Sequence, residues 1–192
     1  MKEIPPSEEQ IIDQREEEKM SRILFLVFIA MAYAASAPAA EKVIRMNLVS
    51  DQGVGEPIGT VTATDSQFGL ILTPQLSNLP PGVHGFHVHQ NPDCSHVMPG
   101  GKPMAALAAG GHYDPDKTDR HAGPYGNGHL GDLPFLYVDK AGKSSLPVLA
   151  PRLKVADLQG RSLMVHAGGD NYSDLPEKLG GGGMRISCGA VK

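Results

Sequence analysis

The chain has 192 residues, of which 41% are hydrophobic and 20% are charged, with 17 basic and 21 acidic side chains and a formal net charge of −4. This length and hydrophobic content suit one domain with its own core. The near balance of charge excludes a basic nucleic-acid-binding protein and an acidic tail protein.

The N-terminal part is not expected to belong to that domain. Residues 1–19 form an acidic leader, which we expect to be disordered or not translated, with translation starting at Met20; an N-terminal extension of the protein is the alternative. Residues 1–39 hold four basic and seven acidic side chains, so residues 40–192, the expected folded domain, have a net charge of about −1. Any electrostatic attraction of a substrate therefore has to be local.

An export signal follows the leader. Lys19 and Arg22 precede a thirteen-residue apolar run, residues 23–35, and small residues come after it. This pattern predicts a secretory signal peptide over residues 20–39, with cleavage after Ala39. The run is shorter than the roughly 20 residues that a membrane span needs, although a retained membrane anchor is the alternative. We therefore expect an exported protein with no stable membrane association after cleavage.

The chain has two cysteines, Cys94 and Cys188, both in the exported part. An even pair in an oxidising compartment predicts one disulfide. It would close a loop of about 95 residues, for which the chain-entropy estimate is roughly 4–5 kcal/mol. Two free buried thiols are the alternative, and cysteine metal ligands are disfavoured because no C-x-x-C motif surrounds either residue.

Runs rich in apolar and β-branched residues, separated by glycine and proline, occupy most of the exported part. They cover residues 42–48, 59–64, 68–74, 84–89, 135–138, 153–156, 162–166 and 184–187. Eight short strands with turn signals between them favour an antiparallel sandwich or barrel. Two long segments, residues 90–133 and 167–183, lack this pattern and are expected to be functional loops.

Seven side chains of the metal-ligating kind lie in or beside these loops: His87, His89, His112, His121, His129, Asp132 and His166. His87 and His89 alternate along a predicted strand, so both point to one face. Seven ligands are too many for one tetrahedral zinc site and suit two adjacent metals that share a ligand. Nitrogen-rich ligation without cysteine suits copper and zinc, and it indicates redox chemistry.

Five segments closely resemble the motifs of the copper–zinc superoxide dismutase family, in its exported bacterial branch. They are residues 84–89 (HGFHVH), 111–115 (GHYDP), 128–134 (GHLGDLP), 163–170 (LMVHAGGD) and 183–189 (GMRISCG). The resemblance covers residues 42–192. It implies an all-β, eight-stranded antiparallel Greek-key barrel or sandwich with two long metal-binding loops. It also implies a periplasmic enzyme that converts superoxide to oxygen and hydrogen peroxide.

The resemblance further implies a role for each matching residue. Copper would take His87, His89, His112 and His166, and zinc would take His112, His121, His129 and Asp132. The imidazole of His112 would bridge the two ions, and a proton on this ring would pass to the second superoxide. Asp170 would accept hydrogen bonds from His87 and His121, and Arg185 would guide the superoxide anion. The Cys94–Cys188 bridge would hold the loop of residues 90–111, and with it Arg185.

Two other readings use the same residues. A copper carrier would need neither a bridging histidine nor an anion guide, and a zinc-stabilised structural domain would not need His87, His89 and His166 together. The enzyme is therefore favoured. Met184 departs from the family pattern, in which a smaller residue is usual. A monomer and a homodimer both fit the sequence.

Overall fold

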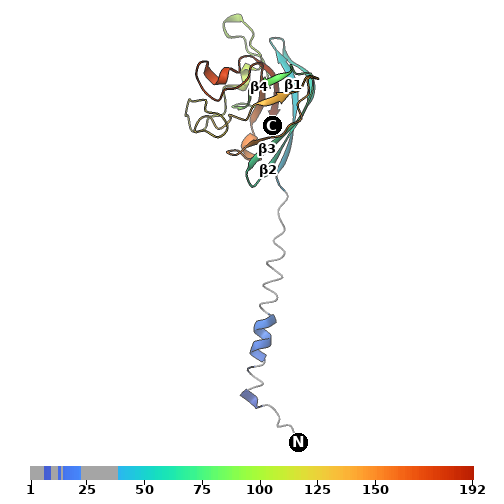
Figure 1. Cartoon of the computed structure of the whole chain (residues 1–192), viewed down its shortest axis with the longest axis vertical. Helices are drawn as coiled ribbons and strands as arrows, with labels where there is room; N and C mark the ends of the chain where they lie inside the picture. Colours follow the sequence, from blue (N-terminus) through green and yellow to red (C-terminus); the bar gives the residue numbers. More distant parts are fainter. Residues whose placement is uncertain (1–6, 10–12, 14, 23–38) are drawn as a thin grey trace. The chain divides into compact units, whose positions relative to one another are not determined.

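The computed structural model describes residues 7–9, 13, 15–22 and 39–192, and the chain divides into two units, Met1–Pro38 and Ala39–Lys192. The described residues of the first unit are helical from residue 8 onward (Figure 1). The apolar run of the predicted signal peptide lies outside the described residues. Among the residues that are described, no helix is long and apolar enough to cross a bilayer.

The second unit is built from antiparallel strands. Its nine strands are β1 (Glu41–Ser50), β2 (Gly53–Ser66), β3 (Gly69–Leu76), β4 (Gly82–His84), β5 (Phe86–His89), β6 (Leu136–Val138), β7 (Val148–Ala150), β8 (Arg161–His166) and β9 (Arg185–Val191). Four 3₁₀ turns lie between them: η1 (Pro99–Gly101), η2 (Leu107–Ala109), η3 (Val155–Leu158) and η4 (Lys178–Gly181). Seven strands form one sheet in the order β5-β8-β9-β1-β2-β3-β7, and β4 pairs with β6. The large sheet curls into an open half-barrel (Figure 1).

One hydrophobic core fills the interior of this half-barrel. Side chains from both sheets meet in it, and Val61 of β2, Leu72 of β3, Phe86 of β5 and Leu136 of β6 are each 0% exposed. Burial of a side chain of this size stabilises the fold by roughly 1.5–3 kcal/mol. The all-β prediction is confirmed.

The predicted strand over residues 84–89 is divided at Gly85, which is one reason for nine strands rather than eight. β4 pairs with β6 in the small sheet, whereas β5 pairs with β8 in the large one. The N–H of Gly85 leaves both ladders and donates to the carbonyl of Gly168 at 2.8 Å. A Cβ at this position would lie 3.1 Å from the ring of His87, so glycine lets the chain change sheets beside a buried imidazole.

The predicted strand over residues 153–156 is wrong, while the other seven predicted strands are present. The strand that pairs with β3 in this region is β7, which comes earlier. The carboxylate of Asp157 accepts the backbone N–H of Lys154 at 2.8 Å, and the chain then turns into η3. Leu153 is only 1% exposed, so its apolar character reflects core packing rather than a sheet.

The predicted metal ligands of β5 lie on the outer face of the large sheet. Phe86 and Val88 point into the core, so the alternation of a strand turns His87 and His89 outward. Both histidines are nonetheless buried, at 0% and 1% exposure. The covering chain is the long connection between β5 and β6, which has no strand between residues 90 and 135.

The predicted disulfide is present and ties this connection to β9. Cys94 and Cys188 are bonded, with Cα atoms 5.8 Å apart. Beneath the bridge, Ala106, Ala109 and Met164 form a small buried apolar cluster with Cys188. The loop is therefore fixed on the outer face of the sheet by a covalent bond and by packing.

Candidate metal centre

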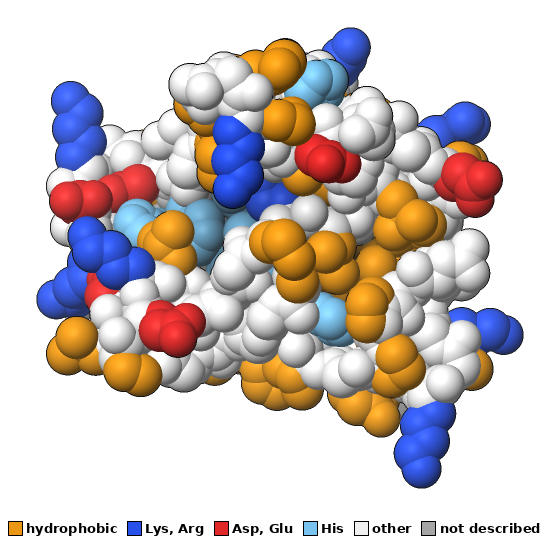
Figure 2. Space-filling model, turned by 90° about the horizontal axis from the view of Figure 1, so that it is seen from above, with side chains coloured by type: hydrophobic (Ala, Val, Ile, Leu, Met, Phe, Trp, Pro, Cys, Tyr) orange, Lys and Arg blue, Asp and Glu red, His pale blue; other side chains and the backbone are white. Residues whose placement is uncertain are grey.

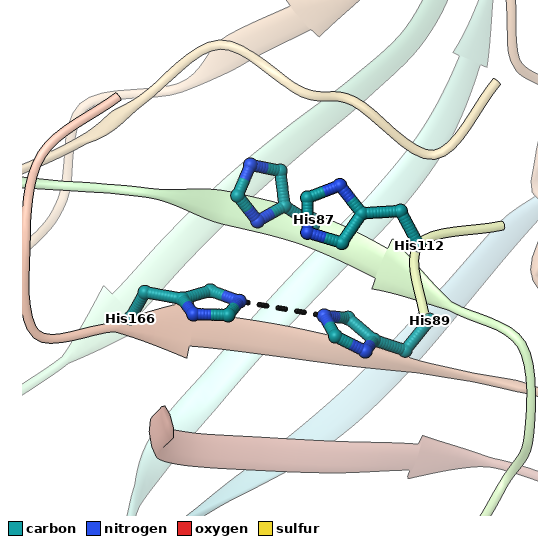
Figure 3. A group of neighbouring side chains, drawn as sticks. All are labelled: His87, His89, His112 and His166. Atoms are coloured by element: carbon teal, nitrogen blue, oxygen red, sulfur yellow. Dashed lines mark hydrogen bonds between the residues drawn. The ribbon is translucent and has the colours of Figure 1, made fainter. Parts of the chain in front are cut away.

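Four histidines gather on the outer face, each offering a ring nitrogen within 4.8 Å of the others: His87, His89, His112 and His166 (Figure 3). β5 supplies two of them, β8 ends at the third, and the long β5–β6 connection brings the fourth. All four are buried. In Figure 2, histidine side chains are visible at several places on this face, and the group at the left lies in a hollow among basic and acidic side chains.

The rings of His89 and His166 present their Nε2 atoms to the same space. His89 Nδ1 lies 2.9 Å from the carbonyl oxygen of Gly110, and His166 Nδ1 lies 3.1 Å from that of Gly183. Because a carbonyl only accepts, both Nδ1 atoms are donors, and in the neutral rings both Nε2 atoms carry lone pairs. These two Nε2 atoms are 3.4 Å apart (Figure 3). Converging lone pairs are suited to a shared cation.

His87 completes this arrangement. Its Nε2 donates to a carboxylate oxygen of Asp170 at 2.7 Å, and its Nδ1 is buried without a hydrogen-bond partner. An unpaired buried nitrogen is costly unless something binds it. His87 also lies within 4.8 Å of ligand atoms of His121 and Asp132, but with one free nitrogen it can serve only one ion.

A second group surrounds one carboxylate oxygen. Oδ1 of Asp132 lies 2.9 Å from Nδ1 of His112, 3.0 Å from Nδ1 of His121 and 3.3 Å from Nδ1 of His129. Nδ1 of His121 is buried and makes no hydrogen bond. Three imidazole nitrogens and one carboxylate oxygen are the donor set of a tetrahedral zinc site.

His112 belongs to both groups. Its Nδ1 faces Asp132, whereas its Nε2 is buried and has no hydrogen-bond partner. The ring stacks on that of His87, with centroids 3.9 Å apart. The two nitrogens of one ring thus face the two ligand groups. The residues present fit two cations, one on each side of His112.

The two groups differ in charge. Burial holds the pKa of His87 and of His89 well below 6.5 and lowers the pKa of His166 to about 4. These rings are neutral at pH 7 and keep the lone pairs that a metal needs. Burial would also lower the pKa of His121, but the carboxylates of Asp132 and Asp170 outweigh it and raise the pKa to about 9.

Asp170 joins the two groups from the second long loop. Its Oδ2 accepts from His87 and its Oδ1 from Nε2 of His121, each at 2.7 Å. Burial raises the pKa of this carboxyl, but the hydrogen bonds from the two rings outweigh it, so the net shift is downward. A charged acceptor of this kind orients ligand rings and makes them better donors to a metal.

Arg185 lies at the start of β9, beside the four-histidine group. Its guanidinium donates to the carbonyl oxygens of Ala106 and Gly110 at 2.5 and 2.6 Å. It is partly buried, and its charge contributes to the lowered pKa of both His89 and His166. The arginine is therefore an oriented cation next to the neutral histidine group.

Two further residues hold the carboxylate-centred group and were not foreseen in the sequence. Oδ2 of Asp174 accepts the backbone N–H of His121 at 2.8 Å. The guanidinium of Arg152 donates to four backbone carbonyls in the segment that contains His129. Each acts on backbone groups of a distant segment, and no motif or spacing marks such contacts.

His84 has a structural place beside the site. It is 2% exposed, and its two ring nitrogens lie 2.8 Å from the carbonyl oxygens of Pro80 and His166. The ring therefore links β4 to the end of β8, where a predicted ligand sits. The eighth histidine of the chain, His96, lies beside Gly53, where an added Cβ would be 3.3 Å from its Nδ1.

The chain is similar to known proteins over most of its length. The family model described as "Copper/zinc superoxide dismutase (SODC)" matches residues 58–191. The "Superoxide dismutase [Cu-Zn] 2" of Salmonella typhimurium is 52% identical over 170 residues, which is 88% of this chain and 98% of that protein.

Solved structures agree with this similarity. The Cu/Zn superoxide dismutase from Brucella abortus is 49% identical with a TM-score of 0.78, covering 80% of this chain and 100% of that one. The monomeric copper, zinc superoxide dismutase from Salmonella enterica is 52% identical with a TM-score of 0.73, at the same coverage.

Proposed function

The chain belongs to the copper/zinc superoxide dismutase family, and we propose how its residues divide the work of that enzyme. The reaction turns two superoxide anions and two protons into oxygen and hydrogen peroxide, with copper and zinc as cofactors. Copper would be held by His87, His89, His112 and His166. Zinc would be held by His112, His121, His129 and Asp132.

The observation that carries the proposal is the position of His112 between the two ligand groups. Nδ1 lies 2.9 Å from Asp132 Oδ1, and Nε2 is buried without a partner among the neutral histidines. We infer that this ring would offer one nitrogen to each ion. Removing either nitrogen from its group would leave an incomplete donor set on that side.

The bridging position gives His112 a second task. Bound copper supplies one-electron redox chemistry by alternating between two oxidation states. When Nε2 of His112 is not engaged, it could hold one proton and deliver it to the second superoxide, which becomes hydrogen peroxide once it has also gained one electron and a second proton. The carboxylate of Asp132 keeps Nδ1 in place meanwhile, so the proton acceptor stays aimed at the substrate.

Arg185 would attract the substrate. Its two hydrogen bonds to backbone carbonyls hold the guanidinium beside the copper ligands, and carbonyl acceptors leave its positive charge uncompensated. The domain as a whole is close to neutral, so a local cation of this kind is the means of attracting an anion. Met184, which precedes it, is 75% exposed and stands on the solvent side.

We propose that the enzyme acts in the periplasm and protects the cell envelope from superoxide. The disulfide supports this, because such bonds persist in oxidising compartments. The predicted signal peptide over residues 20–39 supports it too. Fractionation of cells that express the full chain, with immunodetection of its size, tests both the compartment and the cleavage.

The activity itself is tested with the purified chain, reconstituted with copper and zinc, beside an Arg185→Ala variant. We expect fast dismutation that weakens as salt increases, and a much slower, salt-insensitive reaction in the variant. Two tightly bound metals without turnover would instead indicate a copper carrier.

A further inference from the structure

Arg152, which follows β7, makes four hydrogen bonds to the backbone of residues 123–129, the segment that ends at the proposed zinc ligand His129. Its Nε donates to the carbonyl of Pro124 at 3.0 Å, Nη1 to Gly128 at 3.1 Å, and Nη2 to Gly123 at 3.3 Å and to His129 at 2.6 Å. Four carbonyls within seven residues of chain thus converge on one guanidinium. The shortest of these bonds goes to a proposed zinc ligand.

These contacts hold the segment rather than neutralise a charge. Arg152 is part-buried and forms none of the ion pairs found in the described part of the chain. An arginine normally prefers a carboxylate, which matches its planar fork. Here the fork is used on backbone oxygens of a segment that has no strand or helix. Apart from Arg152, the carbonyl oxygens of Gly123 and His129 each accept only a long bond, from the N–H of Gly126 at 3.4 Å and of Asp132 at 3.3 Å.

The other end of the arginine is fixed. Leu153, its neighbour, is 1% exposed in the core, and its N–H donates to the carbonyl of Ala150 of β7 at 3.3 Å. Among the described residues, the hydrogen bonds that join residues 123–129 to the barrel all come from Arg152. The segment's remaining backbone bonds are local, such as that from His129 N–H to the carbonyl of Arg120 at 2.9 Å.

We propose that Arg152 is a positioning residue for zinc: it holds residues 123–129 in the conformation that binds the ion, before the ion arrives. This rests on the proposed function, because it assumes zinc at His121, His129 and Asp132. Ordering a loop residue costs backbone conformational entropy. A segment that is already ordered by the barrel does not lose that freedom when zinc binds, so the affinity is higher.

The contacts of Arg152 concern the proposed zinc site and not the proposed copper site. Arg152 touches the backbone around His129, whereas the copper-side rings of His89 and His166 are oriented by the carbonyls of Gly110 and Gly183. Loss of the arginine should therefore weaken zinc and leave copper binding unchanged.

The test measures metal affinities of the metal-free full chain by competition with chelators, together with the visible spectrum of Co²⁺ bound in place of zinc. We expect Arg152→Gln to weaken zinc binding about 10–100-fold, to change the Co²⁺ spectrum, and to leave copper affinity as in the wild type. The matched control is Lys154→Gln, a nearby exposed cation whose Nζ donates to the carbonyl of Ser66 outside this segment. It should match the wild type in every respect.

A second variant covers the case in which Arg152→Gln does not fold. Arg152→Lys keeps the charge but loses the fork, so zinc binding should fall by a smaller factor, and amides of residues 121–129 should exchange faster in the metal-free protein. Wild-type zinc affinity and an unchanged Co²⁺ spectrum in either folded variant would overturn the proposal. If His129→Ala also bound zinc like the wild type, the ligand assignment would fail instead, independently of Arg152.

Discussion

His89 and Arg185 donate to the same acceptor, the carbonyl oxygen of Gly110, at 2.9 and 2.6 Å. One backbone group thus sets the tautomer of a proposed copper ligand and the direction of the proposed anion guide. Both acceptors of Arg185, Ala106 and Gly110, belong to the connection that the disulfide ties to β9. The position of the guanidinium therefore depends on the bridge between Cys94 and Cys188.

Removal of this bridge should lower both stability and substrate capture. For the double substitution Cys94→Ala with Cys188→Ala, we expect the free energy of unfolding to fall by about 2–5 kcal/mol. We also expect kcat/KM to fall and to lose part of its salt dependence, because the loop that orients Arg185 is released. Denaturant unfolding and activity at several ionic strengths check the two effects. Full, salt-sensitive activity in the variant would mean that packing alone orients Arg185.

Gly180 offers a steric test of the hydrogen bond between Asp170 and His121. It has φ +70°, and a Cβ there would overlap Oδ1 of Asp170 and approach Nε2 of His121 to 2.8 Å. Gly180→Ala should therefore break the hydrogen bond between these two side chains and weaken zinc binding roughly tenfold or more. Gly181→Ala is the matched control, since its φ is +77° but a Cβ there meets only Glu177 at 3.6 Å.

Both variants carry the same left-handed backbone strain, so both should lose a similar amount of stability. Only the variant at Gly180 should lose zinc. Equal zinc affinities, measured by chelator competition, would show that the contact of Asp170 with His121 contributes nothing to metal binding.

Asp170→Asn tests the same carboxylate by chemistry instead of sterics. An amide has one oxygen, so it can accept from His87 or from His121 but not from both. We expect zinc affinity to fall about 10–100-fold, because outer ligand contacts of this kind are worth that much. The control is Glu177→Gln, a change of the same type on an exposed side chain of the same loop. It should leave the zinc and copper affinities unchanged. Retention of wild-type zinc and copper affinity in Asp170→Asn would contradict the proposed role.

Much of this protein was predictable because its motifs are local. His87 and His89 on one strand, the glycines around His112 and His129, and Asp132 three residues after His129 can be recognised without any structure. Seven of the predicted strands are present for a similar reason, since alternation and turn residues act over a few positions.

The remainder depends on contacts between distant segments. The division of the strand at Gly85 follows from a hydrogen bond to Gly168, and the turn after β7 is held by Asp65, whose carboxylate accepts the N–H of Val155 at 2.8 Å. Arg152 and Asp174 bind backbone groups, and any residue type offers such groups. Sequence patterns therefore identified the residues that gather in the two ligand groups, and the resemblance identified Asp170, but neither identified Arg152 or Asp174.

The different protonation states of the two ligand groups predict different pH dependences for the two metals. In the metal-free protein the pKa of His121 is raised to about 9 by Asp132 and Asp170, so this ring carries a proton at pH 7 that zinc must displace. Zinc affinity should thus rise about tenfold per pH unit from pH 7 toward 9 and level off above it. The pKa of His129 is raised as well, which steepens the rise. The proton on His121 stabilises the metal-free fold fully below pH 6.5, and this contribution is lost as the pH rises through about 9.

On the copper side the pKa of His166 is about 4, so copper displaces no proton from this ring between pH 6 and 9. Titration calorimetry in buffers of different ionisation enthalpy counts the released protons, and a zinc affinity that stays flat from pH 6 to 9 would contradict the charged state of His121.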